Sequence, residues 1–335
     1  MIDEATLRKL ELWDDGDRLA LQQFLADSGL RYEDDIDAAF GLFDGDERLL
    51  GCGCAAGKLL KCFALDVSLR GQNALGTLVS ALMQDRFDKG LSDLMVITRR
   101  QNEAYFTGCG LFPLARTETL VLLENRADGP ERFCRPLLHS EDSGKTVGAI
   151  VMNANPFTKG HEYLVRQASR SCDVLHLFVV EEDRSMFPSA VRRNLVERCV
   201  GDLANVRIHL SGSYMISAAT FPTYFLKDGE NAARLQSELD ITLFAERIAP
   251  NLNISVRFAG SEPKDATTAI YNEAMRTILP RCGIAFREIP RLEVGGAAVS
   301  AGRVRKCMER QDWEQLAALV PETTLQYLRS EWKRG

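Results

Sequence analysis

Between residues 147 and 289 the sequence alternates short apolar segments with amphipathic ones, a pattern that few folds accommodate. The runs 147–152 and 174–180 have the composition of buried strands, and 161–170 between them carries apolar residues at helical spacing. Strands that alternate with helices through short loops indicate an α/β fold with a parallel, doubly wound sheet. Further strands are expected at 206–210, 254–258 and 284–289, and helices at 188–200, 235–248, 266–279, 300–309, 312–319 and 322–332.

The first half of the chain has an α+β order around a mostly antiparallel sheet. Asp44-Gly45 lies between two apolar runs and is typical of a hairpin turn. The expected elements are a helix at 3–28, strands at 38–43, 48–56 and 59–65, a helix at 74–90, a strand at 93–98, a helix at 102–108 and a strand at 119–123. A polar stretch at 138–145 ends this half. Because 335 residues suit two domains, we place these at 1–140 and 141–335.

The net charge of −6 is divided unequally between the two halves. Residues 1–140 hold 23 acidic and 16 basic side chains, whereas residues 141–335 hold 24 and 25. Without a large basic field the chain is not expected to bind nucleic acid, and a small anionic ligand is better placed in the second half. No apolar run reaches the ~18–20 residues of a membrane span. Because Met1–Glu4 also lacks the basic start of a signal peptide, we expect a cytoplasmic protein.

A strand-to-helix turn carries the most informative motif, Asn153-Ala-Asn-Pro-Phe-Thr-Lys-Gly-His161. Gly160 lets the backbone approach a ligand closely. His161 falls in the first helical turn, where free backbone N–H groups and the helix dipole favour an anion. Thr158 and His161 are three residues apart, so both can face one phosphate. The turn therefore suits a nucleoside triphosphate, and the alternative is an ordinary turn with a solvated histidine.

Two short motifs resemble those of the nucleotidyltransferase superfamily, whose fold is Rossmann-like. Thr158-Lys-Gly-His161 matches its [TH]-x-G-H signature, and Val299-Ser-Ala-Gly-Arg-Val-Arg305 matches its second motif, Ile-Ser-x-x-x-x-Arg. Arg303 and Arg305 would add donors for the β- and γ-phosphates. Gly302 stands where serine or threonine is usual, which removes one hydroxyl from the expected phosphate site.

Longer blocks narrow the resemblance to the citrate lyase ligase family. They are 153–161, 182–188, 216–225 and 260–263, together with Tyr271-Asn272. The resemblance covers essentially the whole chain, since that family also has an N-terminal acetyltransferase-like domain. It implies an acid–thiol ligase that uses ATP, Mg²⁺ and acetate. Through acetyl-adenylate, the enzyme would acetylate the phosphopantetheine-type thiol on the acyl carrier (gamma) subunit of citrate lyase. AMP and pyrophosphate would leave, and citrate lyase would become active for citrate fermentation.

The resemblance also implies roles for individual residues. Acetate is ionised at pH 7 and needs no general base, so the task is to orient the reactants and neutralise the departing pyrophosphate. His161, Thr158 and Arg305 are the expected catalytic residues, with Mg²⁺ on ligands that the sequence does not identify. The expected ATP-binding residues are Asn153, Asn155, Phe157, Thr158, Gly160, His161, Arg192, Gly260, Glu262, Ser300, Arg303 and Arg305.

Several of these assignments have structural alternatives. Gly260 and Glu262 could form only a tight turn, and Arg192 could be a surface residue of its helix. The aromatic segment Thr220–Phe225 could line an acetate pocket, receive the pantetheine arm, or pack in a core. An adenylyltransferase acting on a phosphorylated small molecule is the alternative function. A regulatory protein that only binds a nucleotide or acetyl-CoA is a third.

The first domain resembles a GNAT-type acetyltransferase. Asn102–Gly110 is similar to the final motif of that family, but the cofactor loop departs from its Arg/Gln-x-x-Gly-x-Gly or Ala pattern. Aligned on Arg70, the glycine positions carry Asn73 and Leu75, and Leu75 is expected to obstruct the pyrophosphate of acetyl-CoA. We therefore predict a GNAT-like domain without acetyltransferase activity, used for packing or for recognising the carrier.

Overall fold

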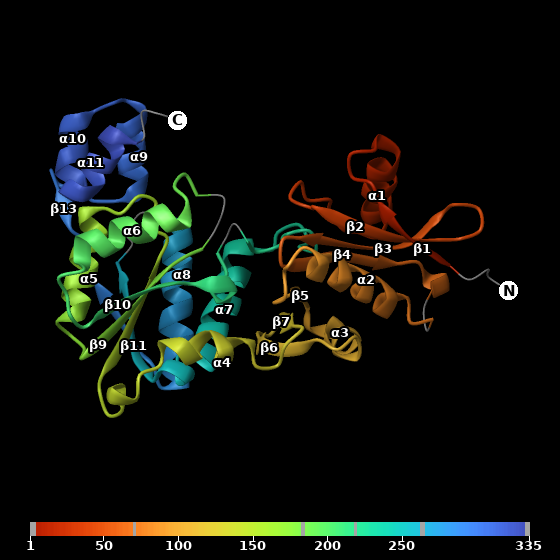
Figure 1. Cartoon of the computed structure of the whole chain (residues 1–335), viewed down its shortest axis with the longest axis horizontal. Helices are drawn as coiled ribbons and strands as arrows, with labels where there is room; N and C mark the ends of the chain where they lie inside the picture. Colours follow the sequence, from red (N-terminus) through yellow and green to blue (C-terminus); the bar gives the residue numbers. More distant parts are fainter. Residues whose placement is uncertain (1–4, 70–71, 182–184, 218–219, 262–264, 332–335) are drawn as a thin grey trace. The chain divides into compact units, whose positions relative to one another are not determined.

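The computed structural model describes residues 5–69, 72–181, 185–217, 220–261 and 265–331, and the chain divides into two compact units. The first comprises Met1–Gly129 and Phe221–Leu235, and the second Pro130–Thr220 and Gln236–Gly335. Figure 1 shows the helices and strands of both, most of them labelled. Within the described residues, no helix is long and apolar enough to cross a membrane.

A seven-stranded sheet in the order β1-β2-β3-β4-β5-β7-β6 forms the centre of the first unit. Neighbouring strands are antiparallel except β4 and β5, which are parallel and pair at Leu59 and Met95. Helices α1 and α2 cover opposite faces (Figure 1). The elements are β1 (Thr6–Leu10), α1 (Asp15–Asp27), β2 (Ala38–Phe43), β3 (Leu49–Ala56), β4 (Leu59–Leu65), α2 (Ala74–Asp88), β5 (Met95–Arg99), α3 (Glu103–Gly108), β6 (Phe112–Arg116) and β7 (Leu120–Glu124).

The α+β order expected for this unit is confirmed, but two of its details were wrong. The helix expected at 3–28 begins only at Asp15, where Asp14 accepts a hydrogen bond from the backbone N–H of Asp17. Thr6–Leu10 instead pairs with β2 as an edge strand. Its side chains are mostly exposed, so no alternating pattern marked it. The edge strand β6 was also missed, because Pro113 interrupts its pattern.

In the loop before α2, Leu75 does not take the position in which it was expected to obstruct the pyrophosphate of acetyl-CoA. Asn73 adopts a left-handed conformation, with φ of 55°, so it takes the backbone shape that glycine usually provides. The Leu75 side chain packs against the apolar cluster of α2 and the sheet, which includes Val79 and Leu82. Leu75 is therefore turned toward the core and is not the obstacle that the sequence suggested. Arg70 and Gly71 lie outside the described residues.

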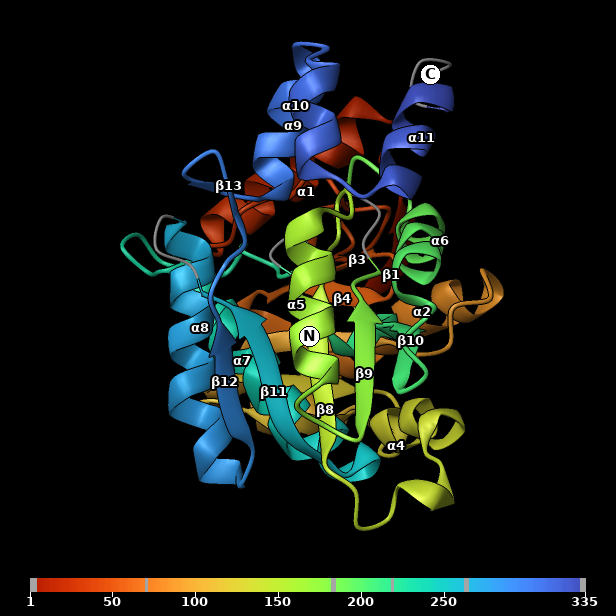
Figure 2. The same ribbon diagram turned by 90° about the vertical axis from the view of Figure 1, so that its left-hand side faces the viewer.

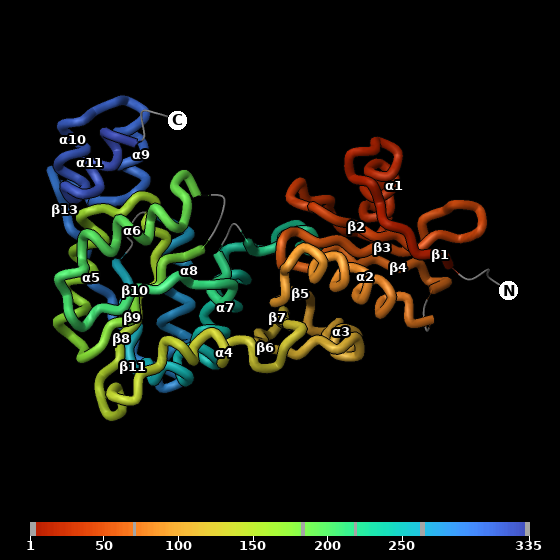
Figure 3. The backbone as a smooth tube through the Cα atoms, viewed as in Figure 1, coloured from red at the N-terminus to blue at the C-terminus, as the bar shows by residue number. Residues whose placement is uncertain are grey.

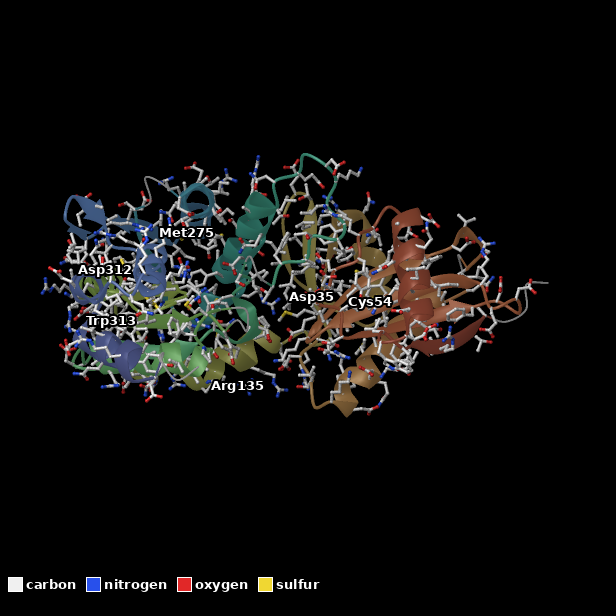
Figure 4. All side chains as sticks on the ribbon, turned by 90° about the horizontal axis from the view of Figure 1, so that it is seen from above. Asp35, Cys54, Arg135, Met275, Asp312 and Trp313 are labelled. Atoms are coloured by element: carbon white, nitrogen blue, oxygen red, sulfur yellow. The ribbon has the colours of Figure 1, made fainter. Side chains whose placement is uncertain are left out.

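A segment from the second half of the sequence completes the first unit. Tyr224 is buried in the cluster formed by α1 and the sheet, and its carbonyl accepts a hydrogen bond from the Arg31 backbone N–H at 3.0 Å. The backbone N–H of Thr223 donates to the Glu33 carboxylate at 2.8 Å, and Arg99 pairs with Glu230. Figure 3 traces this segment as a tube, and Cys54, in the same cluster, is labelled in Figure 4.

This segment corrects the expected domain division. The first unit ends at Gly129 and not at residue 140, and it also includes Phe221–Leu235 from the second half of the sequence. The aromatic residues Phe221 and Tyr224 are buried, so core packing accounts for this part of the segment 220–225.

The second unit contains the predicted parallel sheet, in the order β10-β9-β8-β11-β12. Helices α5 and α6 cover one face, and α7 and α8 the other (Figures 1 and 2). The elements of the sandwich are α4 (Gly129–Cys134), β8 (Val147–Met152), α5 (Lys159–Ser169), β9 (Val174–Val179), α6 (Ser189–Val200), β10 (Val206–Leu210), α7 (Ala232–Leu243), β11 (Ile254–Gly260), α8 (Ala266–Ile278) and β12 (Ala285–Ile289).

Three helices follow the sheet and pack on one another around Val304, Leu316 and Leu328. They are α9 (Ala301–Glu309), α10 (Trp313–Leu319) and α11 (Glu322–Ser330), preceded by the short strands β13 (Glu293–Val294) and β14 (Ala297–Ala298). All five strands and the helices predicted for this half are confirmed. The helix expected at 235–248 is α7 continued by a π-helical turn at Phe244–Ile248.

The strand order gives this sheet a topological switch point between β8 and β11. Strands β8 and β11 are neighbours, but β9 and β10 extend the sheet on one side and β12 on the other. The connections therefore diverge at the carboxyl ends of β8 and β11, and ligands of open α/β sheets bind at such switch points.

Candidate functional site

A cavity of about 490 Å³ opens at this switch point, entirely within the second unit. Its walls include the turn after β8, the end of β11, the start of α9 and parts of α7 and α8. Met275, labelled in Figure 4, is one of the residues that α8 contributes. The volume is in the range typical of small-molecule sites.

The β8–α5 turn is fixed by a reciprocal pair of hydrogen bonds. The Thr158 hydroxyl accepts from the backbone N–H of His161 at 3.2 Å, and His161 Nδ1 accepts from the backbone N–H of Thr158 at 3.1 Å. Because Nδ1 acts as an acceptor, the proton of a neutral ring lies on Nε2. The ring also stacks on Phe157, with 5.6 Å between centroids, so its orientation is well defined.

His161 is uncharged at neutral pH in this environment. Burial, and secondarily the positive charge of Arg291, lower the pKa of His161 from 6.5 to about 4. The imidazole therefore offers a neutral Nε2–H donor beside the N-terminus of α5, where backbone N–H groups favour an anion.

The two signature motifs meet at this cavity. A β-carbon on Gly160 would lie 2.9 Å from the carbonyl oxygen of Val299, so only glycine allows the α5 turn to approach the start of α9 this closely. Ser300 caps α9 and accepts from the backbone N–H of Arg303 at 3.2 Å. Gly160, His161 and Ser300 all line the cavity.

The expected site residues fall into two groups. Asn153, Gly160, His161, Gly260 and Ser300 line the cavity. Behind this wall lie Asn155, Phe157, Thr158 and Arg305, which support it.

The supporting residues make specific contacts. Phe157 and Thr158 are completely buried, and the hydroxyl of Thr158 is engaged with His161. Arg305 Nη1 donates to the Asn155 carbonyl at 2.6 Å, which ties α9 to the turn. Glu262 lies outside the described residues.

Two arginines expected to bind phosphate have other partners. Arg192 is fully buried, and its guanidinium donates to the carbonyl oxygens of Phe187, Asn153 and Val180 at 2.6–2.9 Å. Arg303 donates to the carbonyl oxygens of Val294 and Ala297 in the β13–β14 hairpin. Helical position alone did not reveal that backbone carbonyls accept hydrogen bonds from both side chains, and the assignment of these arginines to phosphate stays a prediction.

Four cavity residues were missed as functional candidates: Asp240, Arg257, Tyr271 and Arg291. Arg291 donates through Nε to the Ser261 carbonyl at 2.7 Å. Arg257 is the single charged side chain of β11, an otherwise apolar strand, and that was the available sequence signal. Asp240 falls on a helix, where its position carried no comparable signal, and Tyr271 was noted only as part of a block that resembles the family.

Asp240 is held by two donors. Its carboxylate accepts from the Ile216 backbone N–H at 2.6 Å and from the Tyr271 hydroxyl. Burial outweighs these contacts and raises the pKa of Asp240 to about 6. Among the described residues there is no cluster of three or more His, Cys, Asp or Glu side chains suited to a metal ion.

Comparison with known proteins gives one consistent family. A family model described as the citrate lyase ligase C-terminal domain matches residues 147–328. The chain is 41% identical over 328 residues to a [citrate [pro-3S]-lyase] ligase of Klebsiella pneumoniae, covering 96% of each protein. It is 23% identical over 126 residues to a phosphopantetheine adenylyltransferase of Alkaliphilus oremlandii, covering 36% of this chain and 80% of the relative. A solved structure of Thermotoga maritima TmcAL bound with alpha-thio ATP aligns with a TM-score of 0.38 and 17% identity, covering 56% of each chain.

Proposed function

We propose that this chain, which belongs to the citrate lyase ligase family, uses ATP to acetylate the thiol prosthetic group of the citrate lyase acyl carrier (gamma) subunit. The observation that carries the proposal is the meeting of two phosphate-type motifs at one cavity, with His161 as a neutral donor. The reaction would take place in the cytoplasm and activate citrate lyase.

The chemistry has two steps. A carboxylate oxygen of acetate attacks the α-phosphorus of ATP, and the bond to the bridging oxygen of pyrophosphate breaks. The thiol sulfur of the carrier then attacks the acyl carbon of acetyl-adenylate, AMP leaves with the bonding electrons, and the thiol proton passes to solvent. An ionised acetate needs no general base for the first step.

The cavity wall provides what the first step requires. His161 Nε2 and the N-terminal N–H groups of α5 face the negative charge that develops on the triphosphate. Thr158 and Phe157 hold the His161 ring, and Arg305 holds the turn through Asn155. In this assignment Thr158 and Arg305 are positioning residues.

Magnesium would enter with the nucleotide. Mg²⁺ usually keeps several waters and is bound by substrate phosphates with one or two carboxylates. That coordination does not need a dedicated protein cluster, and none is present among the described residues. The ion would neutralise charge on the pyrophosphate.

The adenylyltransferase alternative is not favoured. The match to a relative of that name covers 36% of this chain, whereas the match to a ligase covers 96%. A transfer to a phosphorylated acceptor also needs a second phosphate site. Neither cavity arginine suits that site, because Arg291 lies near His161 and Arg257 is deeply buried.

We further propose that the GNAT-like first unit serves packing or recognition of the carrier, without acetyl transfer. Leu75 faces the core and so gives this proposal no support. The proposal rests instead on the sequence of the 70–76 loop, which departs from the family pattern. Asn73 stands in this loop where the pattern has glycine.

The proposed function is tested by measuring pyrophosphate from the full chain with ATP and Mg²⁺. We expect release that depends on acetate, and AMP that accumulates over many turnovers only when the carrier with its free thiol is added. Release that requires 4′-phosphopantetheine and ignores acetate would establish the adenylyltransferase instead.

A further inference from the structure

Arg257 is a buried cation whose donors are not all satisfied. It lies in the middle of β11, is 2% exposed, and lines the cavity. Its guanidinium carbon lies 4.2 Å from the centroid of the Phe244 ring. Nε and Nη1 have no hydrogen-bond partner, and no ion pair joins Arg257 to a carboxylate among the described residues.

The nearby acid, Asp240, acts on Arg257 through its charge but makes no hydrogen bond or ion pair with it among the described residues. Both hydrogen-bond donors to Asp240, the Ile216 N–H and the Tyr271 hydroxyl, come from other residues. Leaving a buried donor unsatisfied costs roughly 1–3 kcal/mol, and more for a charged group. A guanidinium with unsatisfied N–H groups beside a cavity can therefore donate hydrogen bonds to an anion that enters that cavity.

The position of Arg257 separates it from the phosphate-binding wall. It precedes Gly260 by three residues, which is about 10 Å along a strand at roughly 3.3 Å per residue. Val256 and Phe258 face the α5–α6 side of the sheet, whereas Arg257 faces Phe244 and Tyr271 on the other. The triphosphate motifs lie at the strand ends, so a second, smaller anion fits this deeper position.

We propose that Arg257 binds the carboxylate of the acid substrate, a short aliphatic monocarboxylate. A guanidinium can hold a carboxylate through two parallel N–H···O bonds, which fixes the plane of the ligand. Met275 and Ile216, which line the same cavity, are apolar and suit a short alkyl group. This inference rests on the proposed function and assigns the acid site within it.

The same guanidinium contributes to both steps. While one carboxylate oxygen attacks the α-phosphorus, the other stays hydrogen-bonded to Arg257. After pyrophosphate leaves, that second oxygen is the carbonyl oxygen of acetyl-adenylate. It gains negative charge when the thiol adds, and a positioned cationic donor stabilises this charge.

The test compares Arg257→Gln and Arg257→Lys with a matched control, Arg287→Gln. Arg287 is an exposed arginine on the adjacent strand, β12. Initial rates of pyrophosphate release give KM for acetate and kcat, and calorimetry with a non-hydrolysable ATP analogue gives nucleotide affinity. Thermal unfolding checks that each variant is folded.

We expect Arg257→Gln to raise KM for acetate by roughly 10- to 100-fold, in line with the loss of a charged hydrogen bond. Arg257→Lys should fall between Gln and the wild type. Affinity for the ATP analogue should stay within about twofold in both, and Arg287→Gln should match the wild type. An unchanged KM for acetate in a folded Arg257→Gln, or an equal loss of nucleotide affinity, would overturn the assignment.

A wild-type measurement keeps the test independent of folding. Propanoate and formate should compete with acetate, and neutral acetamide of similar shape should not. Competition by acetamide at the same concentration would also overturn the assignment. If the wild type shows no acetate-dependent pyrophosphate release, the proposed function fails and the inference fails with it. If the wild type releases pyrophosphate normally and the Arg257 variants have the same KM for acetate as the wild type, the inference fails but the proposed function stands.

Discussion

Replacing His161 by asparagine or by glutamine separates the two functions of its ring. Nδ1 accepts from the Thr158 N–H at 3.1 Å, and in the proposed function Nε2–H donates to the triphosphate. An asparagine oxygen can reach the Nδ1 position, so His161→Asn keeps the capping contact and loses the donor. A glutamine amide can reach the Nε2 position, so His161→Gln keeps the donor and loses the contact.

The expected magnitudes follow from these contacts. Loss of one preorganised donor to a charge that develops in the transition state costs roughly 10²–10³ in rate, about 3–4 kcal/mol. His161→Asn should therefore lower kcat for acetate-dependent pyrophosphate release by that factor while unfolding close to the wild-type temperature. His161→Gln should keep activity within about tenfold and lose about 1 kcal/mol of stability, as for a lost N-cap.

Steady-state pyrophosphate release and thermal unfolding of both variants provide the assay. His139→Gln, a substitution of an exposed histidine outside the cavity, is the control. The reasoning is refuted if His161→Asn is as active as the wild type, or if both variants lose activity equally at unchanged stability.

Three further outcomes are expected. Arg192→Gln should lower the free energy of unfolding in urea titrations by roughly 1–3 kcal/mol for each buried carbonyl that it leaves unpaired, whereas exposed Arg193→Gln should not; unchanged stability with weaker ATP binding would favour the phosphate role. Stability should fall as pH drops from about 6.5 to about 4, because burial holds the pKa values of His161 and His176 near 4 and that of His209 near 3. These three histidines bind fewer protons folded than unfolded in that window, and together they outweigh the opposite effect of Asp240, whose pKa is raised to about 6. Equal unfolding free energies at pH 7 and pH 4.5 would contradict the assignment. Calorimetry of the full chain with acetyl-CoA should show no micromolar binding to the first unit, and saturable micromolar binding would show that the 70–76 loop still works.

Sequence pattern predicted the second unit well because its central strands, β8 and β9, are buried on both faces. A strand such as Val174–Val179 is continuously apolar, and the helices between strands have one apolar face. The [TH]-x-G-H turn could be placed at the sheet edge because glycine and a capping threonine have local, sequence-determined roles. His161 and Gly160 consequently lie where they were expected.

Other features depend on tertiary contacts that no local pattern records. The segment containing Tyr224 joins a core built from residues more than a hundred positions earlier. Arg192 and Arg303 were expected to bind phosphate, but Arg192 donates to buried backbone carbonyls and Arg303 Nη1 donates to carbonyls of the β13–β14 hairpin. Arg257 shows the converse, since a single charge within an apolar strand is a local signal, and no motif includes it.

Oxygen transfer from the acid to the nucleotide tests the central claim most directly. The full chain is incubated with ATP, Mg²⁺, the thiol form of the carrier and acetate labelled with ¹⁸O in both carboxylate positions, and AMP is examined by mass spectrometry. If acetate attacks the α-phosphorus and AMP leaves from acetyl-adenylate, each AMP carries one ¹⁸O and the acetyl thioester retains the other. Unlabelled AMP, or label found in inorganic phosphate beside ADP, would contradict the account.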